Sequence, residues 1–246
     1  MRIVILSDIH SNLEALDAVL VRARDERAQA TYVLGDIVGY GADPNGVIER
    51  LAEQPSPVLI AGNHDLAATG RFDTEWFNRV AAEAITWTES VLEPDARAFL
   101  SKLEPRHDAA EGLLVHGSVV DPAAEYVLNL DVARASFQAA EFGHCFFGHT
   151  HLPTLFVDAG GRIDGHALRD GAGVSLEANG GKRFMINPGS VGQPRDGDPR
   201  ASMMIYDTTD HIAVVHRVPY AIERAASKIR DAGLPAMLAE RLAIGH

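Results

Sequence analysis

The chain has 246 residues, 46% hydrophobic and 23% charged, the composition of a globular protein that can bury a sizeable core. Its formal net charge of −12 argues against general binding of nucleic acid or anionic membranes, because both attract basic surfaces. The only cysteine, Cys145, excludes an internal disulfide and lies in an apolar run, where we expect a buried hydrophobic residue and not a nucleophile.

The amino-terminal part of the chain predicts strands that alternate with helices. Ile3–Leu6 is a short apolar run rich in β-branched residues, typical of a strand buried on both faces, and Thr31–Leu34 and Val58–Ala61 are similar. Apolar residues at helical spacing predict helices from Ser11 to Arg27 and from Pro44 to Glu53. This order predicts a βαβαβ unit with a mainly parallel sheet.

The middle of the chain continues with helices and two more buried strands. A helical pattern extends from Ala67 to Leu103, and its aromatic residues are expected mainly in the core. Gly112–Val115 and Cys145–Phe147 predict strands, and a helix capped by Asp131 is expected to end at Phe142.

Beyond Pro153, short strands separated by glycine turns predict an antiparallel sheet, followed by a helix from Ala221 to Arg230. The expected strands are Thr154–Val157, Val174–Glu177, Arg183–Ile186, Ser202–Tyr206 and Ile212–Val218. Since no linker or internal repeat divides the chain, we expect residues 1–246 to form a single domain with two sheets, the first mainly parallel, flanked by helices.

Side chains that bind metals follow the predicted strands, at the carboxyl ends where open α/β sheets place their ligands. They combine carboxylates, an amide oxygen and imidazoles: Asp8, His10, Asp36, Asn63, His64, His116, His149 and His151. A mixed nitrogen and oxygen set suits Mn, Fe, Co, Ni or Zn and fits Ca or Mg poorly, because the latter prefer oxygen alone. The set is too large for one ion and suits two.

Five segments of the chain together resemble the calcineurin-like metallophosphoesterase family, whose motif order they share. They are Asp8-Ile9-His10, Gly35-Asp36, Gly62-Asn63-His64-Asp65, Val115-His116-Gly117 and Gly148-His149-Thr150-His151. The later run from Ile186 to Arg195, INPGSVGQPR, is similar to the bacterial phosphodiesterase-type branch of this family. The resemblance implies a two-sheet β-sandwich flanked by helices, in four α/β/β/α layers, and two divalent metal ions, for which we expect Mn, with Fe, Ni, Co or Zn as alternatives.

The resemblance also implies a role for each matching residue. Asp8, His10 and His151 would bind one metal ion, Asn63, His116 and His149 the second, and Asp36 both. A hydroxide shared by the two ions would attack phosphorus in line. His64 would contact the phosphate and protonate the leaving alkoxide, and Asp65 would orient a neighbouring histidine.

The chain departs from the protein serine/threonine phosphatases of the superfamily, which continue Gly-Asp into Gly-Asp-x-x-Asp-Arg-Gly. Here the stretch is Gly35-Asp36-Ile37-Val38-Gly39-Tyr40-Gly41, so the Asp that supports the histidine and the Arg that binds phosphate are both absent. Arg195 is the candidate replacement for the phosphate contact, or else a surface arginine, on a bend whose N–H groups at Gly189–Gly192 would face an anion. Further candidates for substrate contact are Asn12, Tyr40 and Asn45.

These residues predict a dinuclear, metal-dependent hydrolase that cleaves small phosphodiesters such as nucleotides. A phosphomonoesterase, a dinucleoside polyphosphate hydrolase and a non-catalytic metal-containing binding protein are the alternatives. Segments such as Ala67–Leu103, which would overhang one side of the site, and Ala159–Gly173 would select the substrate. With no signal-peptide pattern at Met1 and no apolar segment as long as a membrane span, we expect a cytoplasmic protein that contacts no membrane.

Overall fold

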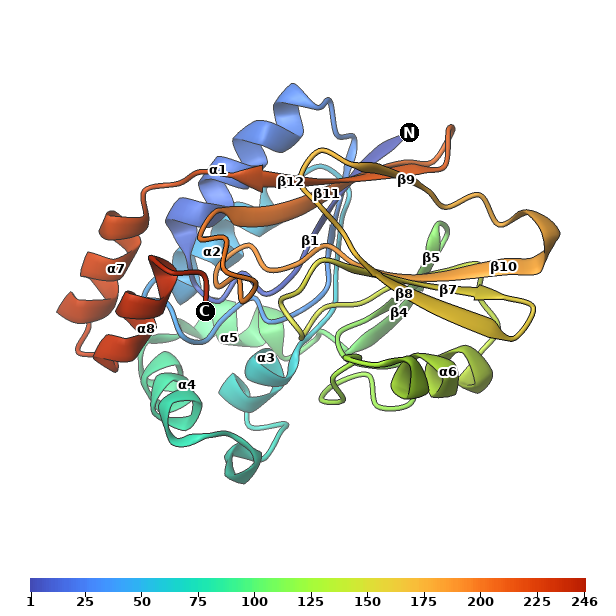
Figure 1. The fold of residues 1–246 in the computed structure, drawn as a ribbon. Helices are drawn as coiled ribbons and strands as arrows, with labels where there is room; N and C mark the ends of the chain where they lie inside the picture. Colours follow the sequence, from blue (N-terminus) through green and yellow to red (C-terminus); the bar gives the residue numbers. More distant parts are fainter.

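The computed structural model describes residues 1–246 and arranges them as two packed sheets with helices on both outer faces (Figure 1). The first sheet has the strand order β3 (Pro57–Leu59), β2 (Ala30–Val33), β1 (Arg2–Leu6), β11 (Ala201–Asp207), β12 (Ile212–Val218), β9 (Gly173–Ser175). The second has the order β4 (Arg106–Ala109), β5 (Gly112–Val115), β6 (His144–Phe146), β10 (Lys182–Asn187), β7 (Thr154–Ala159), β8 (Arg162–Ala167). The predicted two-sheet sandwich is confirmed.

The predicted βαβαβ unit is also confirmed. Strands β1, β2 and β3 pair in parallel and are connected by α1 (Leu13–Asp25) and α2 (Pro44–Ala52). Because they are parallel, their carboxyl ends lie at one edge of the first sheet.

The late strands do not form a separate antiparallel sheet, contrary to the prediction. Strand β11 pairs antiparallel with β1, and β10 pairs in parallel with β6, so both sheets are mixed. Alternation of apolar and polar residues identifies a strand but not its partner, and here late strands complete sheets that early strands began.

Three clusters of buried apolar residues separate the four layers. One lies between the first sheet and helices α1, α2 and α5 (Pro94–Leu100), and a second fills the space between the sheets. The third joins the second sheet to α6 (Leu130–Ala139) and includes Cys145, which is fully buried as predicted. None of the helices is both long and apolar enough to cross a membrane.

The helical segment predicted from Ala67 to Leu103 is divided into short helices. These are α3 (Asn63–Ala68), a 3₁₀ turn (Thr74–Trp76), α4 (Arg79–Val91) and α5. Asn78 starts α4, since its side chain accepts a hydrogen bond from the Ala81 N–H at 3.0 Å. Asn129, and not Asp131, caps α6 in the same way.

Two helices close the chain and lie beside α4 (Figure 1). Helix α7 (Ile222–Asp231) matches the prediction, whereas α8 (Ala236–Leu242) was not predicted. A second 3₁₀ turn, Asn179–Gly181, precedes β10.

Candidate metal centre

The loops after β1, β2, β3, β5 and β6 meet at one edge of the sandwich and bring the predicted metal ligands together. None of the seven ligand residues is more than 7% exposed. Five of them have positive φ angles: Asp8, His10, Asp36, His149 and His151. This conformation is uncommon outside glycine and is retained where the surroundings enforce it, often at functional sites.

The first ligand group consists of Asp8, His10, Asp36 and His151, whose donor atoms lie within 4.8 Å of one another. His10 Nε2 and His151 Nε2 are 3.2 Å apart, and Asp8 Oδ1 is 3.3 Å from His151 Nε2. Asp8 Oδ1 is buried and accepts no hydrogen bond. An unpaired buried carboxylate oxygen beside two imidazole nitrogens fits a bound cation.

The second group consists of Asp36, His116 and His149, and Asn63 lines the same cavity as His149. His116 Nε2 is 3.1 Å from His149 Nδ1. Asn63 Oδ1 is buried without a partner, which fits the amide-oxygen ligand that the sequence predicts. Within each group, therefore, the donor atoms face one another around a common centre.

Asp36 connects the two groups through a single oxygen. Its Oδ2 lies 3.6 Å from His10 Nε2 and 3.4 Å from His116 Nε2. Its Oδ1 accepts a hydrogen bond from the His64 N–H at 2.9 Å. A Cβ atom on Gly62 would lie 2.1 Å from this Oδ1, so only glycine at position 62 leaves room for the carboxylate.

The other ring nitrogen of each histidine ligand contacts a backbone carbonyl oxygen. When that nitrogen donates its N–H to the carbonyl, the other nitrogen, which points to the ligand group, has a lone pair for a metal ion. The hydrogen bond also fixes the ring orientation, as in protein metal sites. The four pairs are His10 with Val38 (3.2 Å), His116 with Leu34 (2.7 Å), His149 with Ala124 (2.9 Å) and His151 with Gln193 (2.5 Å).

Burial and the charges of neighbouring ligands determine the protonation of the residues in both ligand groups. Burial lowers the pKa of His10 and His151, and that of His149 to about 3, so these rings are neutral. Burial also opposes protonation of His116, but the Asp36 carboxylate raises its pKa to about 9. Although burial raises the pKa of Asp36, its histidine neighbours hold it well below the usual value. A cation at this centre would compete with the His116 proton.

His64 lies against the ligands without belonging to either group. Its ring packs against Tyr40 (centroids 4.5 Å apart), Phe77 (4.8 Å) and His10 (4.9 Å). Burial lowers the pKa of His64 to about 4, against the opposing effect of Asp36. His64 also lines the open cavity, where it can reach a substrate.

The predicted contact of Asp65 with a histidine is wrong. Its carboxylate accepts hydrogen bonds from the N–H groups of Gly62 (2.9 Å), Val38 (3.0 Å) and Ile37 (3.2 Å). A short carboxylate that begins a helix satisfies nearby backbone donors more readily than a distant ring. Asp65 therefore fixes the loop that carries Asp36.

The loop from Pro188 to Arg195 supports the first ligand group. The N–H groups of Gly189, Val191 and Gly192 donate to acceptors within the protein, so the predicted orientation of these amides toward an anion is wrong. The Gln193 carbonyl, which sequence analysis missed, orients His151. Arg195 is partly buried beside Asp8 and His151, and its Nε has no partner.

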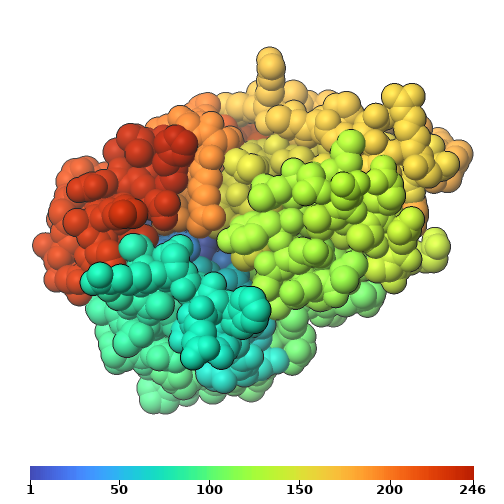
Figure 2. All heavy atoms as spheres, turned by 60° about the horizontal axis from the view of Figure 1, so that its bottom comes forward, coloured from blue at the N-terminus to red at the C-terminus, as the bar shows by residue number.

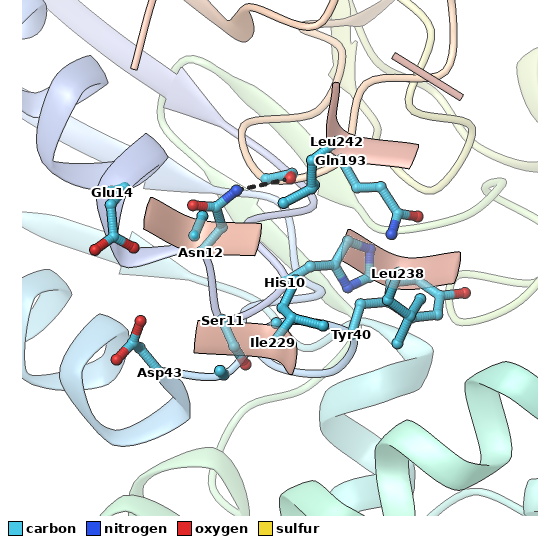
Figure 3. Close-up of a pocket in the computed structure, with 14 residues that line it drawn as sticks. His10, Ser11, Asn12, Glu14, Tyr40, Asp43, Gln193, Ile229, Leu238 and Leu242 are labelled. Carbon is cyan, nitrogen blue, oxygen red and sulfur yellow. Dashed lines mark hydrogen bonds between the residues drawn. The ribbon is translucent and has the colours of Figure 1, made fainter. Parts of the chain in front are cut away.

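Two of the three other candidates for substrate contact have structural roles instead. Asn12 caps α1 through Ala15 N–H (3.1 Å) and donates to Gly192 O (2.9 Å), the dashed line in Figure 3. Asn45 donates a hydrogen bond to the Val91 carbonyl at 2.9 Å and accepts one from the Glu93 N–H at 3.0 Å. It therefore connects α2 to the end of α4. An asparagine in a loop tends to bond neighbouring backbone, which explains both outcomes. Tyr40 contacts His10 and His64 and lines the open cavity.

A cavity of about 430 Å³ opens beside the second ligand group, with Asn63, His64 and His149 in its lining. Residues of the segment predicted to overhang the site form one side, whereas residues 159–173 do not reach it. Figure 2 shows the hollow between the teal segment around residues 70–90 and the yellow-green one around 120–140, with blue amino-terminal residues at its bottom.

The four-layer sandwich and the paired ligand groups define a hydrolase of the metal-dependent α/β/β/α class. The family model described as the calcineurin-like phosphoesterase superfamily domain matches residues 1–211. The chain therefore belongs to the calcineurin-like phosphoesterases, which hydrolyse phosphate esters.

Three similar proteins support this assignment. A metallophosphoesterase from Sphaerobacter thermophilus has 40% sequence identity and a TM-score of 0.90, covering 100% of this chain and 99% of its own. An uncharacterized protein of Methanocaldococcus jannaschii is 37% identical over 248 residues, 99% of this chain and 98% of its own. Phosphodiesterase YfcE of Escherichia coli is 27% identical over 215 residues, 83% of this chain and 87% of its own.

Proposed function

We propose that this protein is a phosphodiesterase that hydrolyses small phosphodiesters, such as nucleotides, with two divalent metal ions, Mn or else Fe, Ni, Co or Zn. The observation that supports this most directly is the position of Asp36 Oδ2, 3.6 Å from a nitrogen of one ligand group and 3.4 Å from a nitrogen of the other. One carboxylate oxygen between two sets of imidazoles is the arrangement that a pair of neighbouring cations needs, and the cation at the second set would displace the His116 proton.

Each residue of the centre then has a defined task. Asp8, His10 and His151 would hold one ion, Asn63, His116 and His149 the other, and Asp36 would contact both. When bound, the ions supply charge neutralisation of the phosphate and activation of water as the nucleophile. Asp65 keeps Asp36 in place through the loop amides it binds.

His64 and Arg195 act on the substrate itself. A phosphate anion against the His64 ring raises its pKa from the low value of the free protein, since an opposite charge favours the protonated form. The ring takes up a proton from solvent and then donates it to the leaving oxygen. The unpaired Arg195 Nε contacts a phosphate oxygen and replaces the arginine that the Gly-Asp motif lacks here.

The charge of the cavity favours a diester over a monoester. No lysine or arginine lines it, and Asp121 does. A diester carries one negative charge at neutral pH whereas a monoester approaches two, so a diester needs less positive charge to bind. The relative YfcE, named a phosphodiesterase, agrees with this choice.

The test compares hydrolysis of bis-p-nitrophenyl phosphate and p-nitrophenyl phosphate with added Mn²⁺ and after chelation. We expect faster cleavage of the diester, dependent on the metal, and loss of activity in Asp36→Ala and His116→Ala. His166→Ala, which removes an exposed histidine outside both ligand groups, is the control and retains activity.

The possible outcomes separate the candidate functions. Faster monoester hydrolysis would identify a phosphatase. Bound metal without cleavage of either ester would favour a binding protein. Unchanged activity in both the Asp36 and the His116 variants would contradict the proposed centre.

A further inference from the structure

Aromatic rings form one wall of the cavity beside the ligand groups. Phe72, Trp76 and Phe77 come from the segment between α3 and α4, and all three line the cavity. Trp76 is 83% exposed, the most exposed large hydrophobic residue of the chain. Phe72 and Phe77 pack edge to face with centroids 6.0 Å apart and support this wall. A tryptophan left this open at the mouth of a cavity indicates a contact made with a ligand.

A second aromatic surface comes from the loop before α6. The Tyr126 ring stacks on the His149 imidazole, with centroids 3.8 Å apart and 18° between the planes. Burial raises the pKa of Tyr126, and the Arg195 guanidinium beside its hydroxyl opposes this rise. Tyr126 thus extends from a metal ligand to the proposed phosphate-binding arginine, and its ring lines the same cavity as Trp76.

The size and charge of the cavity restrict which ligand groups can bind between these rings. Its volume of about 430 Å³ falls within the range of about 300–1,000 Å³ typical of small-molecule sites. It offers no cationic side chain, and Asp121 would repel a second phosphate. An uncharged group fits this space, and the rings favour one with a flat face.

We propose that Trp76, with Tyr126, forms a subsite that selects phosphodiesters in which an uncharged, planar aromatic group, such as a nucleobase, adjoins the scissile phosphate. This rests on the proposed function, which places the phosphate at the metal centre. Stacking on Trp76 adds affinity for aromatic substrates. The subsite disfavours polyphosphate chains, because its lining contains Asp121 and no cationic side chain.

The test measures binding of two ligands with the same phosphomonoester group, adenosine 5′-phosphate and ribose 5-phosphate, to the Mn²⁺-loaded protein. Calorimetry with the full chain gives both affinities. Since the chain has two tryptophans, Trp87→Phe leaves Trp76 as the only indole, and its fluorescence, excited at wavelengths that adenine does not absorb, reports contact directly. Trp76→Ala and Trp76→Phe test the residue, and Met237→Ala removes an exposed apolar side chain on α8, outside the cavity lining, as the control.

We expect adenosine 5′-phosphate to bind about 5- to 100-fold more tightly than ribose 5-phosphate, because stacking of a base on an aromatic ring adds affinity of this size. It should quench Trp76 fluorescence, which ribose 5-phosphate should not. Trp76→Ala should abolish the difference in affinity, whereas Trp76→Phe and Met237→Ala should retain it.

Equal affinities in the unaltered protein, binding of neither ligand, or full discrimination in Trp76→Ala would overturn the inference. If bis-p-nitrophenyl phosphate is nevertheless hydrolysed, only the subsite is refuted. If neither ligand binds and no diester is cleaved, the proposed function fails and the subsite with it.

Discussion

His64 is oriented by aromatic rings, in a chain whose Gly-Asp motif lacks a second carboxylate. Tyr40 and Phe77 pack against the imidazole, and its Nδ1 is buried without a hydrogen-bond partner. A Cβ atom on Gly39 would lie 2.4 Å from this Nδ1, so the loop after Asp36 approaches as closely as glycine allows. Packing against these rings and the glycine loop, more than a hydrogen bond, therefore sets the position of the His64 ring.

The role of His64 as proton donor predicts a dependence on the leaving group. His64→Ala should lower kcat by about 100-fold or more for a dinucleotide, whose alkoxide must be protonated as it leaves. It should lower kcat much less for bis-p-nitrophenyl phosphate, because p-nitrophenolate leaves without a proton. Steady-state kinetics with both substrates measures the contrast, and an equal loss for both would contradict proton donation.

Among the helices and strands, the sequence predicted those with a strong local signal. Short buried apolar runs identified the strands that precede the ligands, and Gly112–Val115 has the predicted bounds. Strand β8 was missed because its residues, Arg162–Ala167, are mostly exposed and polar. Helix α8 was missed because Leu238 and Leu242 become buried only against α7 and α4. Such contacts depend on tertiary packing, which no local pattern contains.

The residues of the candidate site were likewise predicted only in part. Residue type and position after a strand sufficed to select the ligands that the structure brings together. Asn12, Asn45 and Asp65 were misassigned because an amide or carboxylate in a loop also serves the backbone, and its partners, such as Gly192 for Asn12, lie far away in sequence. Trp76 and Tyr126 come from separate segments, and only the fold places both on one cavity.

The pairing of β7 with β10 includes an ion pair that links the second sheet to α6. Asp158 accepts from Arg183 Nε at 3.2 Å and from Gly161 N–H at 2.7 Å, and Arg183 Nη1 donates to Phe137 O at 2.7 Å. Burial raises the pKa of Asp158, but the hydrogen bonds outweigh it and hold the pKa below the usual 3.8. The charged form is therefore the one that stabilises the fold.

Asp158→Asn should lower the free energy of unfolding by about 2 kcal/mol at neutral pH, since hydrogen bonds to charged groups contribute about this much. Because the folded-state pKa is depressed, the contribution is present above pH 3.8 and lost as the pH falls through the folded-state value. Denaturant titrations over this range measure it. Asp164→Asn, which breaks an exposed pair with Arg162, should cost less than about 1 kcal/mol, and equal effects of both variants would contradict this account.

In the molecule as a whole, the candidate metal centre lies where the two sheets meet. Asp8, His10, Asp36 and Asn63 follow strands of the first sheet, whereas His116, His149 and His151 follow strands of the second. Helix α7 is tied to α1 and to the start of α2, which flank the first sheet, since Lys228 Nζ lies 2.7 Å from Glu14 and 2.8 Å from Asp43. These connections support the proposal that residues 1–246 are one domain.

Metal binding should accordingly stabilise the whole chain. At a metal concentration 100 times Kd, one site that exists only in the folded protein adds about 2.7 kcal/mol. We expect Mn²⁺ to raise Tm, chelation to reverse the effect, and fluorescence and circular dichroism to follow a single transition. Asp36→Ala should show little response to Mn²⁺. Two separate transitions would contradict the single domain, and an unchanged Tm would contradict metal binding at the sheet junction.

The most direct test of the central claim is the metal content of the purified protein after saturation with Mn²⁺ and removal of free ions. Elemental analysis should find about two ions per unaltered chain. It should find about one in His10→Ala, which removes a ligand of the first group, and about one in His116→Ala, which removes a ligand of the second. A single ion in the unaltered chain, or two ions retained in both variants, would contradict a centre of two ions that share Asp36.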